Sequence, residues 1–362
     1  MNGRNNPVAL LMLCATPLAA QVFDDLAAKA NAAREADRLE EATVLYRKAL
    51  ELQPAWAEGW WSLGTILYDR DDYPGAARAL NKAFELDPKS GNAAAMLGLS
   101  EAKLGRDADA LRDLEKAIQL GVTDDAGLRP VMLYTMGTLQ LAAGEFSKAQ
   151  DALDLLVRDG PQNDDAVAAL GQAVLGMRPG DFAAADEVTR DAVRQAGLAE
   201  RVAARGDADA ALAAYRKLAA DFPKVHNVEF ACGRFLLARH YDQEAVAAFQ
   251  REIQNSPQHL LARLGIAGAL LNTDPESGLP YARQAVALAP GLAEAHYLLG
   301  ALLLGTGSTE EAIGELETAR RHDPGDARIH FALARAYTLA HRIEDAERAR
   351  AEFLRLNKEN PQ

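Results

Sequence analysis

The chain has 362 residues, of which 49% are hydrophobic, 25% charged and 6% aromatic. That apolar fraction excludes a disordered chain, and the abundance of Ala, Leu, Glu and Arg favours helices over strands. The net charge of −13 argues against nucleic acid and anionic membrane surfaces as partners, and two cysteines cannot form a disulfide scaffold. A chain of this length would ordinarily form two or three domains. The composition therefore predicts a soluble, acidic, mostly helical protein.

The first twenty residues have the pattern of a secretory signal peptide. Arg4 precedes an uncharged run of about 13 residues that ends at Ala20, and acidic Asp24 follows shortly after. A helix of that length spans about 20 Å, which is less than the roughly 30 Å hydrocarbon core of a bilayer. We expect residues 1–20 to be a cleaved signal peptide, with export to the periplasm or the medium and no membrane span afterwards. The alternative is a frayed helix on a cytosolic protein.

Cleavage after Ala20 would remove Cys14 and leave Cys232 as the single cysteine. One thiol cannot form an intramolecular disulfide, so the fold depends on packing. No His or basic cluster adjoins Cys232 in the sequence to lower its pKa. We expect Cys232 to be a buried, unreactive residue.

A period of 34 residues organises the rest of the chain. Pro54 and Pro88 are separated by that period and close the similar phrases ALELQP and AFELDP. The same spacing separates Pro223 from Pro257 and Pro290 from Pro324. Between these prolines, apolar residues recur at i, i+3 and i+4, as in Leu63, Ile66 and Leu67. Each period therefore predicts two amphipathic helices.

These phrases resemble the tetratricopeptide repeat, whose pattern is W-x2-L-G-x2-Y, then A-x3-F, then A-x4-P. The clearest copy is formed by Trp60, Leu63, Gly64, Leu67, Ala76, Leu80, Ala83 and Pro88. A glycine within a helix costs about 1 kcal/mol relative to alanine, so its recurrence suggests close packing against the partner helix's alanine, such as Ala76 on Gly64. The resemblance implies an all-α fold, a right-handed α-solenoid (superhelix) of about ten antiparallel helix-pair repeats.

The repeats divide the chain into three regions after the signal peptide. Residues 21–163 are expected to form an N-terminal array of four repeats, and 226–362 a C-terminal array of repeats seven to ten. Between them, 164–225 contain two degenerate repeats that either continue the stack with drifted sequence or bend it. In 164–205 the first helix of the sixth repeat is either short or merged with the preceding helix. The repeat ranges are 23–56, 57–90, 91–124, 130–163, two between 164 and 225, 226–259, 259–292, 293–326 and 327–360.

The sequence lacks enzyme signatures, with no phosphate-binding loop, GxGxxG, HExxH, CxxC or GxSxG motif. His296 and His330 occupy equivalent places one repeat apart, where a metal pair is the alternative to ordinary packing. We therefore expect no catalytic residues, no metal and no cofactor. An enzyme with an unrecognised site is the remaining alternative.

The resemblance implies that the first helix of each repeat lines a concave face, with repeat positions 2, 5, 9 and 12 pointing into it. Five aromatic residues lie at position 5, which Ala95 interrupts; position 9 adds Asn31 and two arginines, and position 12 adds one tyrosine with Leu237 and Leu304. Large aromatic side chains are common anchors of peptide recognition. The alternative is that position 5 only packs against the neighbouring repeat. The candidate groove residues are Trp61, Tyr68, Tyr134, Phe230, Arg234, Tyr297, Phe331 and Arg335.

Together these features predict a non-enzymatic scaffold that binds a protein or peptide partner in the groove of a repeat stack. The resemblance implies a role in envelope assembly or export, although the repeat itself encodes neither the pathway nor the partner. An oligosaccharide- or peptide-ligand binder using the same aromatic row is the alternative. Residues 22–200 hold 19 Lys/Arg and 31 Asp/Glu, whereas 201–362 hold 19 and 21, so we expect electrostatic steering to differ between the halves. The sequence leaves the oligomeric state open.

Overall fold

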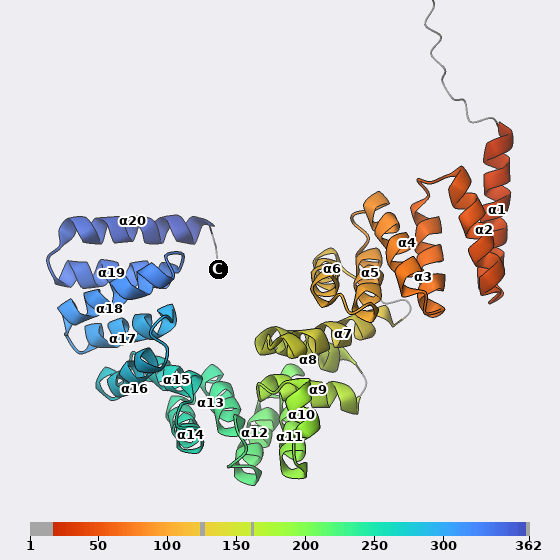
Figure 1. Ribbon diagram of the computed structural model, residues 1–362. Coiled ribbons are helices and arrows are strands. Elements are labelled where there is room, and N and C mark those ends of the chain that lie inside the picture. Colours follow the sequence, from red (N-terminus) through yellow and green to blue (C-terminus); the bar gives the residue numbers. More distant parts are fainter. Residues whose placement is uncertain (1–16, 124–126, 161–162, 360–362) are drawn as a thin grey trace, which may run out of the picture. The chain divides into compact units, whose positions relative to one another are not determined.

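The computed structural model describes residues 17–123, 127–160 and 163–359, and within them the chain forms helices and no strand. The helices belong to two compact units, Met1–Leu156 and Val157–Gln362. The division falls inside α8, a helix that spans Phe146–Asp159. In each unit successive helices run antiparallel and stack on their neighbours (Figure 1). The predicted all-α stack of helix pairs is therefore confirmed.

Unit 1 contains four consecutive helix pairs, the last of which ends beyond the unit boundary. In the first three pairs the two helices pack on each other, and the second helix of each packs on the pair that follows. The helices are α1 (Pro17–Glu35), α2 (Leu39–Leu52), α3 (Ala57–Asp69), α4 (Tyr73–Leu86), α5 (Gly91–Lys103), α6 (Asp107–Leu120), α7 (Leu128–Ala143) and α8 (Phe146–Asp159).

Unit 2 begins with an irregular segment and continues with four regular helix pairs. The irregular segment contains α9 (Asp164–Val174), α10 (Pro179–Ala184), α11 (Glu187–Ala204) and α12 (Ala208–Asp221). The regular pairs are α13 (Val228–Ala238) with α14 (Asp242–Asn255), α15 (Leu260–Leu270) with α16 (Pro275–Leu288), α17 (Ala293–Gly305) with α18 (Thr309–His322), and α19 (Ala327–Leu339) with α20 (Ile343–Glu359).

The turn between the two helices of a repeat depends on one residue with positive φ. Gly307 has φ +82°, and the following Ser308 N–H donates to the Leu303 carbonyl at 2.8 Å. This is the Schellman arrangement, which satisfies the last carbonyls of a helix. His341 takes the same position with φ +59°, although a left-handed backbone is unfavourable for a residue with a Cβ. The turn geometry is thus the same where a histidine replaces the glycine.

The recurrent glycines let the two helices of a repeat approach closely. The nearest side chain is a leucine, while the expected alanine lies close through its backbone, as with the Ala312 carbonyl oxygen, 3.2 Å from a Cβ on Gly300. A Cβ on Gly64 would lie 2.6 Å from Leu80 Cγ, and one on Gly300 would lie 2.6 Å from Leu316 Cγ. The partner side chain is therefore the leucine one helical turn beyond the alanine that the sequence suggested. The alanine itself, such as Ala76, is fully buried, and its small size permits the close approach of the backbones.

The sequence left open whether the first helix of the sixth repeat is short or merged with the preceding helix. In the structure α11 is one continuous helix. The merged alternative is correct, and α9 packs directly against α11. Gly171 and Gly197 cross there so closely that a Cβ on either would lie within 2 Å of the other helix's backbone: 1.8 Å from Val193 O and 1.9 Å from Val167 O. The short α10 contributes no buried residue. The fifth repeat therefore lacks a normal second helix.

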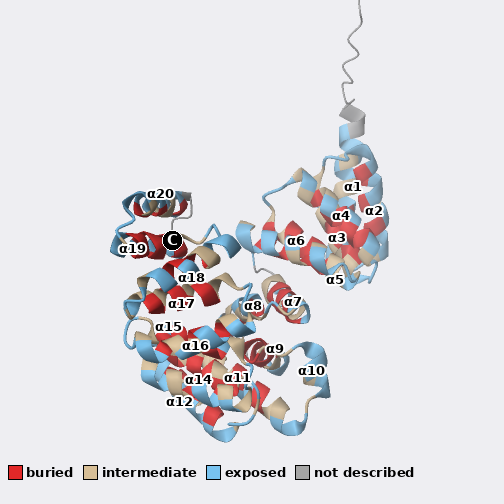
Figure 2. Cartoon of the chain, turned by 60° about the vertical axis from the view of Figure 1, so that its left-hand side comes forward, coloured by how far each residue is buried: buried red, intermediate tan, exposed pale blue. Residues whose placement is uncertain are grey.

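A tyrosine shows that the later part of α11 acts as the first helix of the sixth repeat. In unit 1, Tyr46 of α2 donates to Asn31 of α1 at 2.6 Å, across 15 residues. In unit 2, Tyr215 of α12 donates to Glu200 of α11 across the same separation. Both tyrosine side chains are almost completely buried, and the buried residues form bands between neighbouring helices (Figure 2). The α11–α12 pair thus repeats the α1–α2 packing.

The glycine packing can be tested with two substitutions in adjacent helices. Gly300→Ala in α17 should lower the free energy of unfolding by about 1–3 kcal/mol, because the added methyl overlaps the buried Leu316. Gly314→Ala in α18 should raise it by up to about 1 kcal/mol, because nothing lies within 4 Å and alanine favours the helix. Urea unfolding followed by circular dichroism measures both. Equal effects of the two substitutions would contradict the packing described.

Candidate partner-binding surface

In unit 1 the candidate groove residues lie on the first helices α3 and α7. Trp61 is partly buried against the core of the unit. Tyr68 makes an edge-on contact with Tyr73, with ring centroids 5.4 Å apart, and burial raises the pKa of Tyr68. Its hydroxyl therefore stays neutral and can donate a hydrogen bond. Tyr134 of α7 is the most exposed of the three, at 36%.

In unit 2, Phe230 and Arg234 lie together on α13. The Arg234 guanidinium lies over the Phe230 ring, 5.9 Å from its centroid. The same ring packs on Phe249 of α14 at 5.8 Å and on His259, just before α15, at 4.8 Å. Phe230 therefore takes part in the packing between two repeats and also supports the arginine at the surface.

Tyr297 of α17 is framed by arginines from the next repeat. Arg328 lies 5.0 Å from its ring centroid and forms ion pairs with Glu294 at 2.7 Å and Asp326 at 2.6 Å. Burial raises the pKa of Tyr297, and the nearby charges of Arg328 and Arg335 act in the opposite direction. The Tyr297 ring is therefore held beside Arg328 of the next repeat, and the charge of Arg335 of α19 acts on it across the repeat boundary.

Phe331 is the most exposed of the candidate aromatic rings. It lies on α19 with 49% of its surface exposed, and its ring contacts Phe353 of α20 at 5.3 Å. Arg335 follows one helical turn later on the same helix and is also exposed. In unit 2 the structure thus brings Phe230 together with Arg234, whereas the arginine over Tyr297 is Arg328, which is not among the candidates. The three candidates of unit 1 belong to a separate compact unit.

The two histidines considered for a metal pair have hydrogen-bonding roles. His296 Nε2 donates to the Pro290 carbonyl at 2.9 Å, and His330 Nε2 donates to the Pro324 carbonyl at 2.9 Å. Each bond ties the first helix of a repeat to the proline that closes the preceding repeat. Within the described part of the chain, no group of three or more His, Cys, Asp or Glu side chains could hold a metal ion.

Two other repeats make the same bond with different donors. Trp60 Nε1 donates to the Pro54 carbonyl at 2.9 Å, and Arg263 Nη2 donates to the Pro257 carbonyl at 2.6 Å. Every donor lies six residues after its proline, so Arg263 is the equivalent of Trp60. The sequence contained this signal in the constant spacing from proline, although the residue type changes. It also moves the start of the eighth repeat from residue 259 to 260.

Sequence reasoning missed a polar cluster where α13, α14 and α15 meet. We call it the Asn227 junction, and it consists of His226, Asn227, Glu252, Ser256 and His259. Asn227 has φ +66° and its backbone N–H donates to Glu252 Oε1 at 3.1 Å. Its side-chain amide donates to the Leu175 carbonyl after α9 at 2.6 Å, and its Oδ1 accepts from His259 Nε2 at 2.7 Å. Asn227 therefore links four helices of unit 2.

Glu252 is the charged centre of the Asn227 junction and is completely buried. It accepts hydrogen bonds from the backbone N–H of Phe230 at 3.3 Å and from Ser256 Oγ at 3.1 Å, and His226 Nδ1 lies 3.4 Å away. Burial opposes ionisation, but hydrogen bonds from His226 and Asn227 outweigh it and hold the pKa of Glu252 below its usual value. Glu252 in turn raises the pKa of His226, while burial lowers the pKa of His259.

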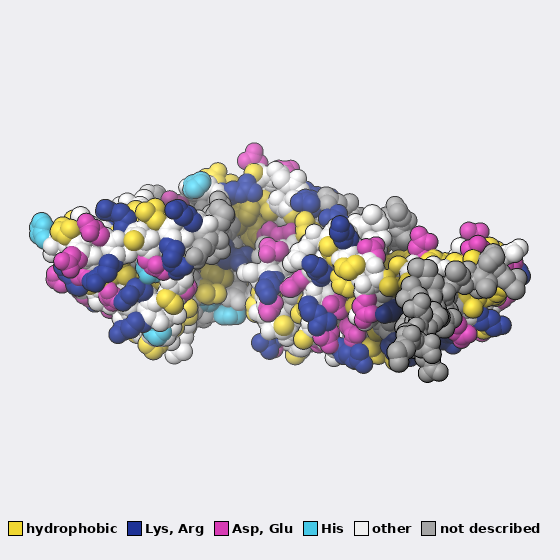
Figure 3. All heavy atoms as spheres, turned by 90° about the horizontal axis from the view of Figure 1, so that it is seen from above, with side chains coloured by type: hydrophobic (Ala, Val, Ile, Leu, Met, Phe, Trp, Pro, Cys, Tyr) yellow, Lys and Arg dark blue, Asp and Glu magenta, His cyan; other side chains and the backbone are white. Residues whose placement is uncertain are grey.

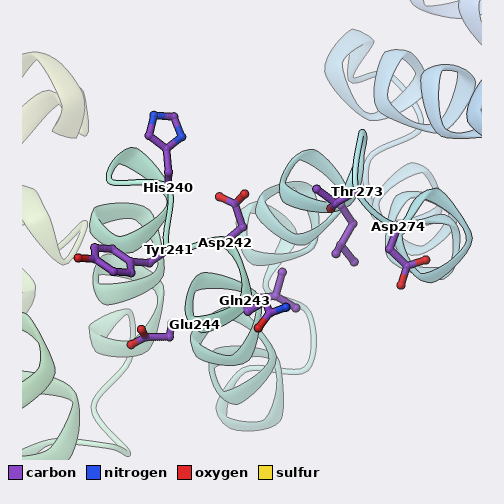
Figure 4. A pocket seen from close by; sticks show the side chains of 9 residues that line it. His240, Tyr241, Asp242, Gln243, Glu244, Thr273 and Asp274 are labelled. Carbon is purple, nitrogen blue, oxygen red and sulfur yellow. The ribbon is translucent and has the colours of Figure 1, made fainter.

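Unit 2 also has open hollows beside its second helices and its turns. One of about 660 Å³ lies between the α13–α14 turn, with His240, Tyr241 and Glu244, and the α15–α16 turn, with Thr273 and Asp274 (Figure 4). Another of about 400 Å³ is lined by residues of α12, α13 and α14, including Cys232.

Cys232 is buried as expected, and burial raises its pKa to about 11, so it stays a protonated thiol at neutral pH.

Acidic and basic side chains are interspersed over the face shown in Figure 3. Along the helices, several ion pairs join residues three positions apart. Exposed pairs of this kind contribute little stability and mainly keep the surface polar. No helix in the described ranges combines the length and apolar character needed to cross a membrane.

Comparison with protein families identifies the repeat. Models described as tetratricopeptide repeat match residues 27–90 and 63–125, and also 269–330 and 303–362. These overlapping matches together cover about half of the chain and fall in both compact units. The chain belongs to the tetratricopeptide repeat family. The comparison with curated proteins found no match.

Several solved structures are similar to parts of the chain. MamA residues 41 to the end from Desulfovibrio magneticus RS-1 is 22% identical, with a TM-score of 0.44, and the match covers 49% of this chain and 99% of that one. Yeast Tom70 is 15% identical, with a TM-score of 0.33, and covers 94% of this chain and 92% of its own. The P58(IPK) TPR domain is 14% identical, with a TM-score of 0.32, and covers 88% and 98%.

The pairing of His226 with Glu252 predicts a pH-dependent contribution to stability. Because the folded pKa of His226 is raised, its contribution is fully present below its unfolded value of about 6.5 and is lost as pH rises through the folded pKa. His226→Gln should therefore lower the urea midpoint more at pH 5.5 than at pH 9. The control is His341→Gln, which changes an exposed histidine elsewhere in unit 2. A loss that is equal at both pH values would contradict this assignment.

Proposed function

We propose that this chain is a non-enzymatic interaction scaffold that binds an extended protein or peptide segment along the first helices of its repeats. The proposed binding residues are Trp61, Tyr68 and Tyr134 in unit 1, and Phe230, Arg234, Tyr297, Phe331 and Arg335 in unit 2. The main support is that a chain with 6% aromatic residues leaves Tyr134 and Phe331 exposed at one repeat position. Stacked helix pairs have extended concave surfaces that suit such binding.

The arginines of unit 2 favour a peptide over an oligosaccharide. A sugar ring binds an aromatic side chain by stacking on its face, but Arg234 lies over Phe230 and Arg328 over Tyr297. In both places the guanidinium occupies the ring face on which a sugar would stack, and the Arg328 guanidinium is itself held by Glu294 and Asp326. A peptide segment with apolar side chains can instead pack along the remaining exposed ring surfaces. Binding of glycans rather than peptides would support the alternative function.

We further propose that the protein is exported and acts in assembly or export at the cell envelope. The support is the signal-peptide pattern of residues 1–20, of which 1–16 lie outside the described residues. Residues 17–20 begin α1, and Ala20 to Val22 are exposed, so cleavage after Ala20 would shorten only the first turn of that helix. Unit 1 would keep every residue that the structure describes as buried, the first of which is Ala30.

Export can be tested by N-terminal sequencing of the mature protein from fractionated cells. We expect the mature chain to begin at Gln21 in the exported fraction. Replacement of Ala20 by a bulky residue should block processing, because the position before the cleaved bond must be small. Protein that keeps Met1 and stays in the cytosol would contradict export without affecting the groove.

The groove can be tested with peptides selected on the purified protein from a random library. Phe331→Ala should weaken the selected peptides by about tenfold or more, because exposed aromatic anchors commonly contribute over 1 kcal/mol. Val188→Ala is the matched control, since Val188 is 57% exposed on α11 and lies outside the groove set. Isothermal titration calorimetry measures both affinities. Equal affinity of the two variants would contradict the groove.

A further inference from the structure

His259, which directly precedes α15, makes two hydrogen bonds that only one protonation state of histidine can make. His259 is the N-cap of α15, and its Nδ1 accepts the Ala262 N–H at 3.0 Å. Its other nitrogen, Nε2, donates to Asn227 Oδ1 at 2.7 Å. Since Asn227 Nδ2 donates to the Leu175 carbonyl, Oδ1 must be the acceptor. The geometry therefore requires a neutral imidazole with its proton on Nε2.

A second proton on this ring would break the cap. Protonated Nδ1 is a donor and would face the Ala262 N–H donor across 3.0 Å, so the ring would have to turn away. Turning would also remove the Nε2 bond to Asn227. The first turn of α15 would lose its cap, and the link between α13 and α15 through Asn227 would open.

The same ring supports Phe230. The rings of His259 and Phe230 lie 4.8 Å apart, and the Phe230 N–H donates to Glu252 in the Asn227 junction. A His259 ring that turns away leaves one side of Phe230 without support. A charged imidazole would be attracted toward Glu252, whose carboxylate already holds the N–H groups of Asn227 and Phe230.

We propose that the Asn227 junction is a proton-operated switch, in which protonation of His259 uncaps α15, separates it from α13 and releases the Phe230 ring. The switch would regulate the groove, and this role rests on the proposed function above. Proton uptake would open the Asn227 junction and release Phe230, which is a candidate groove residue. It would therefore change how a partner segment binds at Phe230.

The charges around His259 set the pH at which the switch operates. Burial lowers its pKa, Glu252 of α14 opposes this, and the charges of His226, before α13, and Arg263 of α15 lower it further. The α13 neighbour, Phe230, is uncharged. Because the folded pKa is below the unfolded value of about 6.5, stability is complete above that pH and falls as pH drops through 6.5 toward the folded pKa. Acidification below about pH 6.5 therefore favours the open form of the switch.

N-cap residues elsewhere in the chain suggest a control variant whose cap does not titrate between pH 5 and 8. Ser90 caps α5 through its hydroxyl at 3.2 Å from the Ala93 N–H, and Asp326 caps α19 at 2.8 Å from the Arg328 N–H. Both residues precede the first helix of a repeat, as His259 does. Serine and asparagine are effective N-caps and stay neutral between pH 5 and 8. His259→Ser and, as a second variant, His259→Asn should therefore keep a cap at both ends of this range.

Hydrogen exchange at pH 7.5 and pH 5.0, corrected for intrinsic exchange rates, tests the switch on the full chain. On acidification the wild type should lose protection on the order of fivefold in segments 226–232 and 258–264, about the stability ratio that one N-cap supplies. Neither His259 variant should lose protection on acidification, because the group that still titrates there is His226, whose pairing with Glu252 is strengthened by acid. Unchanged protection in the wild type, or loss in 258–264 alone, would overturn the proposal, as would equal losses in the variants.

Nuclear magnetic resonance of the histidine rings supplies an independent readout. At pH 7.5, His259 should show a proton on Nε2 and an unprotonated Nδ1. His226→Gln should raise the pH at which His259 titrates, because it removes a positive charge next to the ring. A proton on Nδ1 at pH 7.5 would overturn the switch. Neither measurement needs a partner, so a failure of the groove variants to weaken peptide binding would contradict only the proposed function.

Discussion

The close approach of the two helices in a repeat is the constraint on which the rest of the structure depends. Gly64 and Gly300 bring the backbones together, and a leucine from the second helix fills the space where a Cβ would be. This approach fixes which side of each first helix is buried and which is free. The backbones approach even more closely in the middle of the chain. Gly171 and Gly197 allow α9 to pack directly on α11 there, without a normal second helix between them.

The sides of the first helices that are not buried carry the side chains of the proposed binding surface. They present aromatic rings and arginines that are partly held by neighbouring repeats, as Phe230 is by His259 and Tyr297 is by Arg328. In the function proposed above, such residues would be ordered before a partner binds, so less side-chain entropy would be lost on binding. The same contacts couple the surface to the junctions between repeats, and the Asn227 junction is the place where that coupling includes titratable groups.

The period of 34 residues predicted the helix pairs, because each repeat is a local unit whose apolar spacing and closing proline are visible in the sequence. The partner of Gly64 was not predictable in the same way, since the choice between Ala76 and Leu80 depends on how the helices cross. The proline-carbonyl bond is made by Trp60, Arg263 and His296, and the change of residue type hid a shared role. The Asn227 junction was hidden because it joins residues up to 52 positions apart. The groove residues stay predictions, since exposure alone does not identify a partner.

The central claim is that the exposed aromatic positions of the first helices contact the partner. Site-specific photo-crosslinking tests it most directly, with a photoreactive phenylalanine placed at Tyr134, Phe331 or, as the control, Val188, and a selected peptide as the partner. The account predicts efficient crosslinks at Tyr134 or Phe331 and none above background at Val188. Efficient crosslinking at Val188, with none at Tyr134 or Phe331, would contradict it.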